Sequence, residues 1–361
     1  MRSCFKRWVA CLLIVLLAAT MGLPAFAAED GMILCTDPHE AAVALRDEMV
    51  KRREVISVAF PGESDDIRIA TDIINESLAH TGVPVHGDYL RFGVRKCFVD
   101  LELLQDQGVS LIKLTYTLTY YTTAEQEKKL DTAIEALLTQ LDVYNSGEYE
   151  KVCAIYDYIC ENITYDSWGA LTGDKLVYSA YAALVHKMAV CQGYATLFYR
   201  LALELGLDAR MITGTSGGQS HGWNIVRIGA CYYNVDSTWD AKLAQKNQPY
   251  QYFLCSNDNF GEHNRKASYS TETFMALYPI AKENYDISKV VTPGELNGDG
   301  YVDEEDAIYL LQYVLMPAEF PVYQFVDYTA DGRVDEEDAI YLLQYVLMPE
   351  NFPLQRKTGD S

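Results

Sequence analysis

The pattern of hydrophobic and polar residues predicts mixed helices and strands in residues 28–145. Apolar residues recur at helical spacing in DIRIATDIINESLAHTG, which begins at residue 66. They alternate in VSLIKLTYTLTYY, which begins at residue 109 and is rich in β-branched residues, so it predicts a strand. A strong helix is predicted at 122–141, with Thr122 or Thr123 as its N-cap. We therefore expect an N-terminal α+β accessory domain, and no pattern in it indicates chemistry.

Residues 146–285 predict a second domain. YEKVCAIYDYICENI predicts one helix, and a second begins at Cys191 and ends at Gly206. HGWNIVRI and CYYNVDSTW predict two strands that meet at Gly229-Ala230. A glycine in the first central position suits a tight hairpin turn, which pairs Ile228 with Cys231. The stretch VVTPGE then leads into the C-terminal tail, with residues 286–293 as the linker.

The tail contains an internal repeat. VDEEDAIYLLQYVLMP occurs at 302–317 and again at 334–349. Each copy overlaps an acidic loop, ELNGDGYVDEED at 295–306 or DYTADGRVDEED at 327–338, with glycine at the sixth position. Oxygen-bearing residues at this spacing are typical of EF-hand loops, so we expect two structural Ca²⁺ ions. The expected ligands are Glu295, Asn297, Asp299, Tyr301, Asp303 and Asp306 in the first loop, and Asp327, Thr329, Asp331, Arg333, Asp335 and Asp338 in the second.

A helix is predicted after each calcium loop. At 100° per residue, one arc of the first copy forms the expected buried stripe. It contains Ala307, Ile308, Leu310, Leu311, Val314 and Leu315. The opposite arc contains Glu305, Tyr309, Gln312, Tyr313 and Met316. Exposed tyrosines and a methionine favour a partner surface. The alternative is that the two helices cover each other's aromatic side chains.

This duplicated loop-helix unit resembles the type I dockerin family over residues 294 to about 354. The resemblance implies a small all-α module that calcium holds folded and that binds a cohesin module of a scaffold protein, as in a cellulosome. It also implies recognition residues on the two helices, so that either copy could dock. The matching positions are Glu305, Gln312, Tyr313 and Met316 in the first copy and Glu337, Gln344, Tyr345 and Met348 in the second. Glu295 and Thr329 depart from the usual ligand types.

Charge and the N-terminus define the class of protein further. The formal net charge is −22, and residues 294–361 alone carry 15 acidic and 3 basic residues. This balance argues against nucleic acid and anionic membranes as partners. Residues 1–27 combine a basic start, an apolar run and the small-x-small sequence AFA at 25–27, which predicts a secretory signal peptide and a secreted protein. An uncleaved membrane anchor is the less favoured alternative.

The cysteines include one candidate catalytic nucleophile. Seven follow the signal peptide, at positions 35, 97, 153, 160, 191, 231 and 255. An odd number leaves at least one thiol unpaired within the chain, and no CxxC pair indicates a zinc site or a thioredoxin-type motif. Whether the others form disulfides stays open. Cys191 stands out because it begins a helix, where free N–H groups and the helix dipole favour a thiolate.

A base and an orienting carboxylate can be placed from the hairpin. With the turn at Gly229-Ala230, Trp223 faces Asp236, and His221 shares a face with Trp223. His221 and Asp236 are then diagonal neighbours, close enough for the carboxylate to fix the tautomer of the imidazole. A one-residue slip would separate them. A lone cysteine is more often a core residue, but the pairing geometry favours a Cys191–His221–Asp236 triad.

The same residues resemble the transglutaminase-like core, a branch of the papain-like cysteine enzymes. The blocks VCQGYATLF, HGWNIV and YYNVDSTWD occur in the family's order and cover about residues 150–245. The resemblance implies that Cys191 is the nucleophile, His221 the base and Asp236 the orienting carboxylate in amide chemistry on protein or peptide. It favours a peptidase; the alternatives are a cross-linking transamidase and a catalytically silent binding module. The Cys191 N–H is one expected oxyanion donor, and Gln192, Trp168 or Tyr178 is a candidate second.

The sequence thus predicts an α+β protein with five segments. They are a signal peptide (1–27), an accessory domain (28–145), a papain-like or transglutaminase-like catalytic domain (146–285), a linker (286–293) and a dockerin with paired EF-hand-like calcium loops (294–355). Calcium is the only cofactor that we expect. The expected partners are a cohesin and an amide substrate. The accessory domain could cover the active site as a prosegment or bind substrate, and the sequence does not decide between the two.

Overall fold

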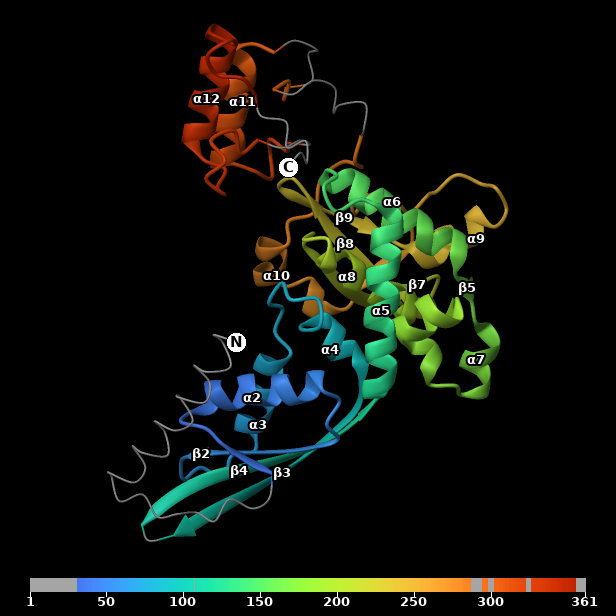
Figure 1. Ribbon diagram of the computed structural model, residues 1–361, viewed down its shortest axis with the longest axis vertical. Helices are drawn as coiled ribbons and strands as arrows, with labels where there is room; N and C mark the ends of the chain where they lie inside the picture. Colours follow the sequence, from blue (N-terminus) through green and yellow to red (C-terminus); the bar gives the residue numbers. More distant parts are fainter. Residues whose placement is uncertain (1–30, 107, 287–293, 298–301, 323–325, 355–361) are drawn as a thin grey trace. The chain divides into compact units, whose positions relative to one another are not determined.

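A computed structural model describes residues 31–106, 108–286, 294–297, 302–322 and 326–354 (Figure 1). The predicted signal peptide lies outside the described residues. No helix within these ranges is long and apolar enough to cross a bilayer.

The chain forms two compact units. The first comprises Met1–His80 and Val94–Tyr120, and the second comprises Thr81–Gly93 and Tyr121–Ser361. The second unit thus takes residues 81–93 and 121–145 from the predicted accessory domain. The reason is that Ile134, Leu137 and Leu138 belong to the same buried hydrophobic cluster as the helix that begins at Cys191.

The first unit is a four-stranded sheet with two helices. Strands run in the order β1-β2-β4-β3, with β1 and β2 parallel and the other pairs antiparallel. The elements are β1 (Met32–Leu34), α2 (Pro38–Val50), β2 (Val55–Pro61), α3 (Arg68–Ser77), β3 (Val94–Asp106) and β4 (Val109–Tyr120). Figure 1 shows α2 and α3 over the sheet, and the Tyr116 hydroxyl of β4 donates to the Ala70 carbonyl of α3 at 2.9 Å. The predicted strand from Val109 is confirmed.

The second unit contains a helical layer and a sheet. Its helices before the sheet are α4 (Asp88–Gly93), α5 (Ala124–Leu141), α6 (Glu148–Asn162), α7 (Ser167–Thr172) and α8 (Cys191–Glu204). Short elements lie between α6 and α8, namely β5 (Thr164–Tyr165), η1 (Leu176–Tyr178), η2 (Ala182–His186) and β6 (Met188–Ala189). Thr123 caps α5 in a capping box with Gln126, which confirms one of the two predicted caps.

The sheet of the second unit has the order β10-β7-β8-β9 and is antiparallel throughout. Its elements and the helices that follow are β7 (Ala209–Ser216), β8 (Gln219–Ile228), β9 (Cys231–Val235), α9 (Ser237–Ala244), β10 (His263–Arg265), η3 (Ala267–Tyr269) and α10 (Glu272–Leu277). Ile228 pairs with Cys231 and Val226 with Tyr233, so the predicted hairpin register is confirmed. The second predicted strand is too long, because the chain leaves β9 at Val235 and enters α9.

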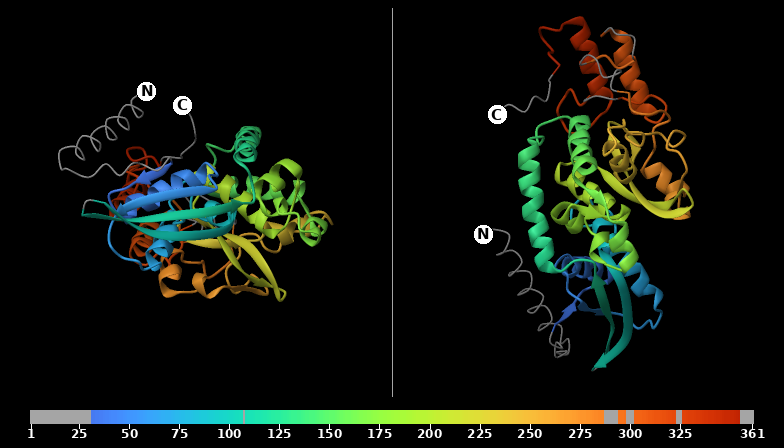
Figure 2. Two further views of the ribbon diagram at one scale, coloured as in Figure 1. Left: turned by 90° about the horizontal axis from the view of Figure 1, so that it is seen from below. Right: turned by 90° about the vertical axis from the view of Figure 1, so that its right-hand side faces the viewer.

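Two near-identical helices follow the linker, α11 (Glu304–Leu315) and α12 (Glu336–Leu347), and they lie side by side (Figure 2). The predicted buried stripe is wrong in part. Ala307 and Leu310 are buried, but Ile308, Leu311 and Leu315 are exposed, and α12 repeats this pattern. The core between two short helices is small, and the half-buried Tyr309 and Tyr313 pack against it.

The seven cysteines within the described ranges are all free thiols. Cys97 is exposed and Cys191 is half-buried, whereas Cys35, Cys160 and Cys255 are buried.

Candidate active site

Cys191 is the first residue of α8. The N-cap before it is Val190, whose extended backbone starts the helix but whose apolar side chain makes no capping hydrogen bond. The first-turn N–H groups of a helix have no acceptor within the helix. The Gly193 N–H donates to the Val190 carbonyl at 2.8 Å. Without a side-chain cap, the N–H groups of Cys191 and Gln192 can serve an anion instead, which suits a thiolate or an oxyanion at this end of α8.

Helix α8 is held closely in place. From Gly193 to Leu203 every residue is buried. The Asn224 side chain on β8 donates to the carbonyls of Ala195 at 3.0 Å and Arg210 at 3.3 Å, which ties the helix to two strands. A Cβ on Gly193 would lie 2.6 Å from the Ala189 Cβ and 2.9 Å from the Val177 carbonyl oxygen. Only glycine allows this approach, so Gly193 fixes where Cys191 lies.

Gly193→Ala is therefore expected to reduce both stability and activity. Overpacking against backbone costs about 1–3 kcal/mol, and relief of the contact would move the start of α8. Urea unfolding gives the stability, and amide hydrolysis gives the activity. Gly222→Ala is the control, because its nearest neighbour is the flexible end of Met211 at 3.2 Å. An equal loss of stability in both variants would contradict this account.

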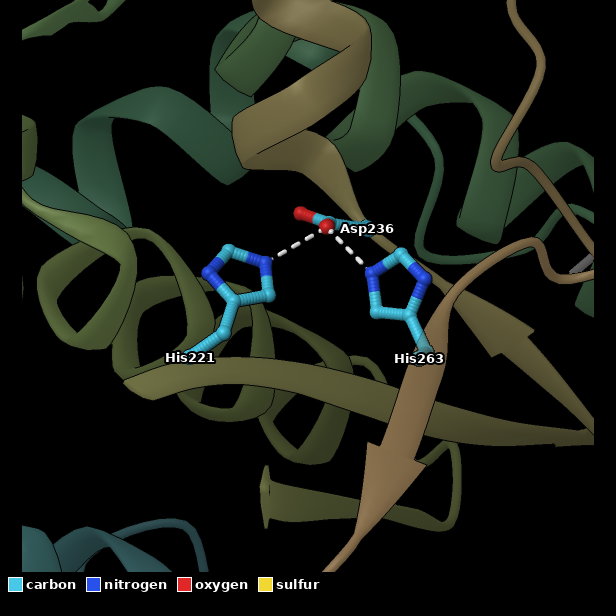
Figure 3. A group of neighbouring side chains, drawn as sticks. All are labelled: His221, Asp236 and His263. Atoms are coloured by element: carbon cyan, nitrogen blue, oxygen red, sulfur yellow. Dashed lines mark hydrogen bonds and ion pairs between the residues drawn. The ribbon is translucent and has the colours of Figure 1, made fainter. Parts of the chain in front are cut away.

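His221 and Asp236 meet as the hairpin register predicts. The His221 Nε2 lies 2.6 Å from the Asp236 Oδ2 (Figure 3). Both side chains are almost fully buried, with 8% and 1% exposed. Since Nε2 is engaged, Nδ1 is the nitrogen left for Cys191, which lies close enough to His221 to help raise the pKa of the imidazole. The three predicted residues are thus brought together in the order thiol, imidazole and carboxylate.

Asp236 serves two purposes through its two oxygens. Its Oδ1 accepts from the backbone N–H groups of Thr238 at 2.9 Å and Trp239 at 3.2 Å, so it caps α9. Its Oδ2 faces the imidazole. Burial alone would raise the pKa of Asp236, but hydrogen bonds and charge from His221 and His263 lower it to about 2. The carboxylate is therefore ionised at neutral pH.

The environment of His221 favours its charged form. Burial disfavours a charged ring, but hydrogen bonds to Asp236 and Cys191, together with their charges, raise the pKa of His221 well above its usual range. Trp223 and Trp239 pack beside the ring, each with a centroid distance of 6.1 Å. A protonated imidazole next to a thiol favours the thiolate, which is the nucleophilic form of cysteine.

A fourth residue, His263, joins this site and was not predicted. Its Nε2 lies 3.0 Å from the same Asp236 oxygen, and it approaches from β10 on the other side (Figure 3). It follows Asp236 by 27 residues, in the irregular stretch GEHNRK. No periodicity there fixes which way a side chain points, so the sequence offered no signal for it.

His221, Asp236 and His263 are the one group of potential metal ligands within the described ranges whose ligating atoms all lie within 4.8 Å of one another. Two ligand atoms on a tetrahedral ion with bonds of about 2.0 Å would lie about 3.3 Å apart. The observed nitrogen–oxygen distances of 2.6 and 3.0 Å are shorter and fit hydrogen bonds. We therefore interpret the group as two imidazoles that are hydrogen-bonded to one carboxylate.

The candidates for a second oxyanion donor have different surroundings. The Gln192 amide nitrogen donates to the carbonyls of Phe92 at 2.9 Å and Tyr178 at 3.2 Å, so both of its hydrogens are engaged. Trp168 is 72% exposed. Tyr178 is near the site through Tyr165, which interacts with both Tyr178 and Cys191. Burial, followed by the charges of Cys191 and Tyr178, raises the pKa of Tyr165 to about 12. The Cys191 N–H remains the best-placed donor.

The second expected calcium loop, residues 327–338, is described throughout, and no three of its carboxylates have ligand atoms within 4.8 Å of one another. Asp327 accepts from the N–H groups of Asp331 at 3.2 Å and Gly332 at 3.0 Å. Asp338 is fully buried and accepts from the N–H groups of Thr329 and Asp335. Of the other expected ligands here, Thr329 donates its hydroxyl to Asp338 at 3.1 Å, Arg333 donates its backbone N–H to Asp331 at 2.8 Å, and Asp335 is the N-cap of α12.

In the first loop, Asp306 is likewise fully buried and accepts from the N–H groups of Asn297 and Asp303. Glu295 is also buried. The expected ligands Asp299 and Tyr301 lie outside the described residues. The two loops thus repeat the same contact at their last position, although they differ in sequence at the first.

The expected cohesin-binding residues lie along α11 and α12 with equal exposure in both copies. Glu305 and Met316 are exposed, as are Glu337 and Met348. The remaining four, Gln312, Tyr313, Gln344 and Tyr345, are half-buried. The two tyrosines among them pack against the small core between the helices.

Comparison with known proteins places a domain within the chain. Residues 135–237 match the family model of the transglutaminase-like superfamily, which typically comprises cysteine-dependent enzymes. Residues 135–237 are therefore similar to a transglutaminase-like domain within a mixed α+β fold, and this range includes Cys191, His221 and Asp236. No curated protein gives a significant match.

Two solved structures are similar to parts of the chain. One is a TGase, with a TM-score of 0.29 and 16% identity over 58% of this chain and 60% of its own. The other is a candidate cysteine protease from Cytophaga hutchinsonii, with a TM-score of 0.25 and 18% identity over 40% of this chain and 65% of its own. The chain thus spans less than two thirds of either structure.

Proposed function

We propose that this chain is a secreted transglutaminase-like cysteine enzyme that cleaves amide bonds in proteins or peptides. The observation that carries the proposal is the 2.6 Å contact between His221 and Asp236, which leaves Nδ1 of His221 for Cys191 at the start of α8. A thiol, an imidazole and an ionised carboxylate in this order are the parts that acyl transfer through cysteine requires.

Each step of the proposed reaction can be assigned to one of these residues. The Cys191 thiolate attacks the amide carbonyl carbon, and the N–H groups at the start of α8 stabilise the oxyanion that forms. Protonated His221 gives its Nδ1 proton to the leaving amine as the carbon–nitrogen bond breaks, which leaves a thioester on Cys191. Water then attacks the thioester and gives a proton to His221, and the thiolate leaves. Asp236 holds the ring in the required orientation throughout.

Hydrolysis and transamidation differ only in what resolves the thioester. The purified mature protein is to be incubated with casein, with and without a fluorescent primary amine. We expect new peptide N-termini in both samples and no fluorescence on casein. Fluorescent casein without cleavage would identify a cross-linking transamidase instead. Neither product, from a folded protein, would favour a catalytically silent binding module.

We also propose that residues 294–355 form a calcium-dependent dockerin that attaches the enzyme to a cohesin module of a scaffold, as in a cellulosome. Two features support this. The loops repeat one pattern of oxygen ligands suited to Ca²⁺, and the helices α11 and α12 repeat one pattern of exposed apolar residues. If bound, calcium would supply positive charge that holds the acidic loop residues together. Duplicated surfaces with equal exposure support docking through either helix.

Removing a calcium ligand is expected to weaken cohesin binding. Asp331 is exposed and occupies the fifth position of the second loop, so Asp331→Ala should remove a ligand without disturbing the core. Calcium titration by calorimetry should show two sites in the wild type and one in the variant. Glu336→Ala removes a neighbouring exposed acid that is not an expected ligand and should leave two. Undiminished binding to a panel of type I cohesins in EDTA would contradict the dockerin assignment.

A further inference from the structure

His263 lies between two hydrogen-bond acceptors. Its Nδ1 is 2.6 Å from the Phe260 carbonyl oxygen, and its Nε2 is 3.0 Å from the Asp236 Oδ2. The side chain is 1% exposed, so no solvent competes for either nitrogen. Aromatic rings enclose it, with Phe260 at 4.1 Å and Trp223 at 5.1 Å between centroids.

The donor and acceptor roles follow from these partners. A carbonyl oxygen only accepts, so Nδ1 of His263 must donate. An ionised carboxylate also only accepts, so Nε2 must donate to Asp236. An imidazole that donates through both nitrogens is the imidazolium cation. A neutral ring would direct a nitrogen lone pair either at the Asp236 oxygen or at the Phe260 carbonyl oxygen, and each is unfavourable in a buried site.

We propose that His263 is a positioning residue for the proposed amide chemistry: as a buried imidazolium it shares the Asp236 oxygen with His221. The inference rests on the proposed function, because it assigns His263 a role in that reaction. The shared oxygen is fixed from both sides, which limits the rotation of Asp236. The ring centroids of the two histidines are 5.6 Å apart, so a charge on His263 repels a charge on His221. The repulsion makes the His221 proton easier to transfer to the leaving amine.

Other groups around His263 do not supply this charge. Tyr252, with a centroid distance of 5.5 Å, is neutral at neutral pH because burial raises its pKa. Arg265 lies two residues further along β10, where its guanidinium donates to Asn234 at 2.8 Å and Asn257 at 3.1 Å. Glu262, the preceding residue, is exposed. The charged group in direct contact with the His263 ring is thus Asp236, and His221 contacts the same carboxylate oxygen.

The test uses the full mature chain labelled with ¹⁵N-histidine. At pH 7 the NMR signals of His263 should show both ring nitrogens protonated, with the assignment taken from the signal that His263→Gln removes. In that variant the amide can still donate to Asp236 but carries no charge. We expect the titration midpoint of His221 to rise by about one pH unit in His263→Gln. His39→Gln, which removes an exposed histidine of the other unit, should not move it.

Two results would overturn the proposal. One is a neutral His263, protonated at Nδ1 alone or at Nε2 alone, and the other is a His221 titration in His263→Gln that superimposes on that of the wild type. A merely structural His263 would give the second result together with a lower unfolding temperature. The proposed function fails separately, if Cys191 of the wild type shows neither casein cleavage nor selective alkylation.

Discussion

Replacing Cys191 by serine is expected to lower casein cleavage by at least about 10³-fold. The serine hydroxyl has the same position at the start of α8. It is, however, far less ionised than a thiol, and the site has no stronger base than His221 to activate it. Folding should be unaffected, because the half-buried thiol is replaced by a slightly smaller group while the buried residues of α8 stay the same. The measurement is the rate of appearance of new N-termini, with circular dichroism to verify the fold.

Cys97→Ser is the matched control for this prediction. Cys97 is an exposed thiol on β3, in the other compact unit, and its loss should leave the rate unchanged. Full activity in Cys191→Ser would show that another group is the nucleophile, and it would remove the basis of the proposed reaction.

Asp236→Asn is expected to lower the rate by about 10³- to 10⁴-fold while the backbone stays in place. Asparagine can still cap α9 through its side-chain oxygen. Its remaining group is then an NH₂, which cannot accept from His221 Nε2, so the ring loses both the required orientation and the charge that supports its protonated form. The rate of cleavage, again measured with casein, checks this expectation.

The same substitution makes a prediction about stability and pH. A carboxyl group whose pKa is lower in the folded than in the unfolded state stabilises the fold above the unfolded value and loses this effect as the pH falls. For Asp236 the pKa falls from 3.8 to about 2, which corresponds to about 2 kcal/mol at neutral pH. The difference in unfolding free energy between wild type and Asp236→Asn should therefore shrink from about pH 4 to pH 2.

The N-cap of α2 offers the control for Asp236→Asn. Asp37 also caps a helix, through the N–H of Glu40, but it is exposed. Asp37→Asn changes the same chemical group in the other unit and should leave cleavage unaffected. A normal rate in Asp236→Asn, or a stability difference that does not depend on pH, would contradict the assigned role of Asp236.

The sequence predicted that His221 meets Asp236 and that Cys191 begins a helix, because local rules fixed each of these features. Gly229-Ala230 set the turn, the turn set the pairing of β8 with β9, and the pairing placed His221 beside Asp236. The extension of the second strand beyond Val235 was wrong, since periodicity does not reveal that Asp236 caps a helix while it holds the imidazole. A residue can perform both tasks because a carboxylate has two oxygens.

Other features depend on contacts that no local pattern encodes. The buried stripe of α11 assumed that an apolar arc faces a core, but the core between two short helices accommodates few side chains, and Ile308 remains 53% exposed. His263 reaches Asp236 after a loop-rich segment whose path is set by packing against Trp223 and Phe260. Both cases require tertiary structure, whereas the position of Cys191 at a helix start required only the sequence.

The central claim, that Cys191 is a nucleophile activated by His221, is tested most directly by alkylation with iodoacetamide at pH 6. An ordinary thiol has a pKa of about 8.5 and is therefore scarcely ionised at that pH. Cys97 is exposed and Cys191 only half-exposed, so access alone favours Cys97. Peptide mapping should show that Cys191 reacts at least about tenfold faster than Cys97 in the wild type, and that His221→Ala abolishes the difference. A Cys191 that reacts more slowly than Cys97 in the wild type, or equally fast with and without His221, would contradict the account.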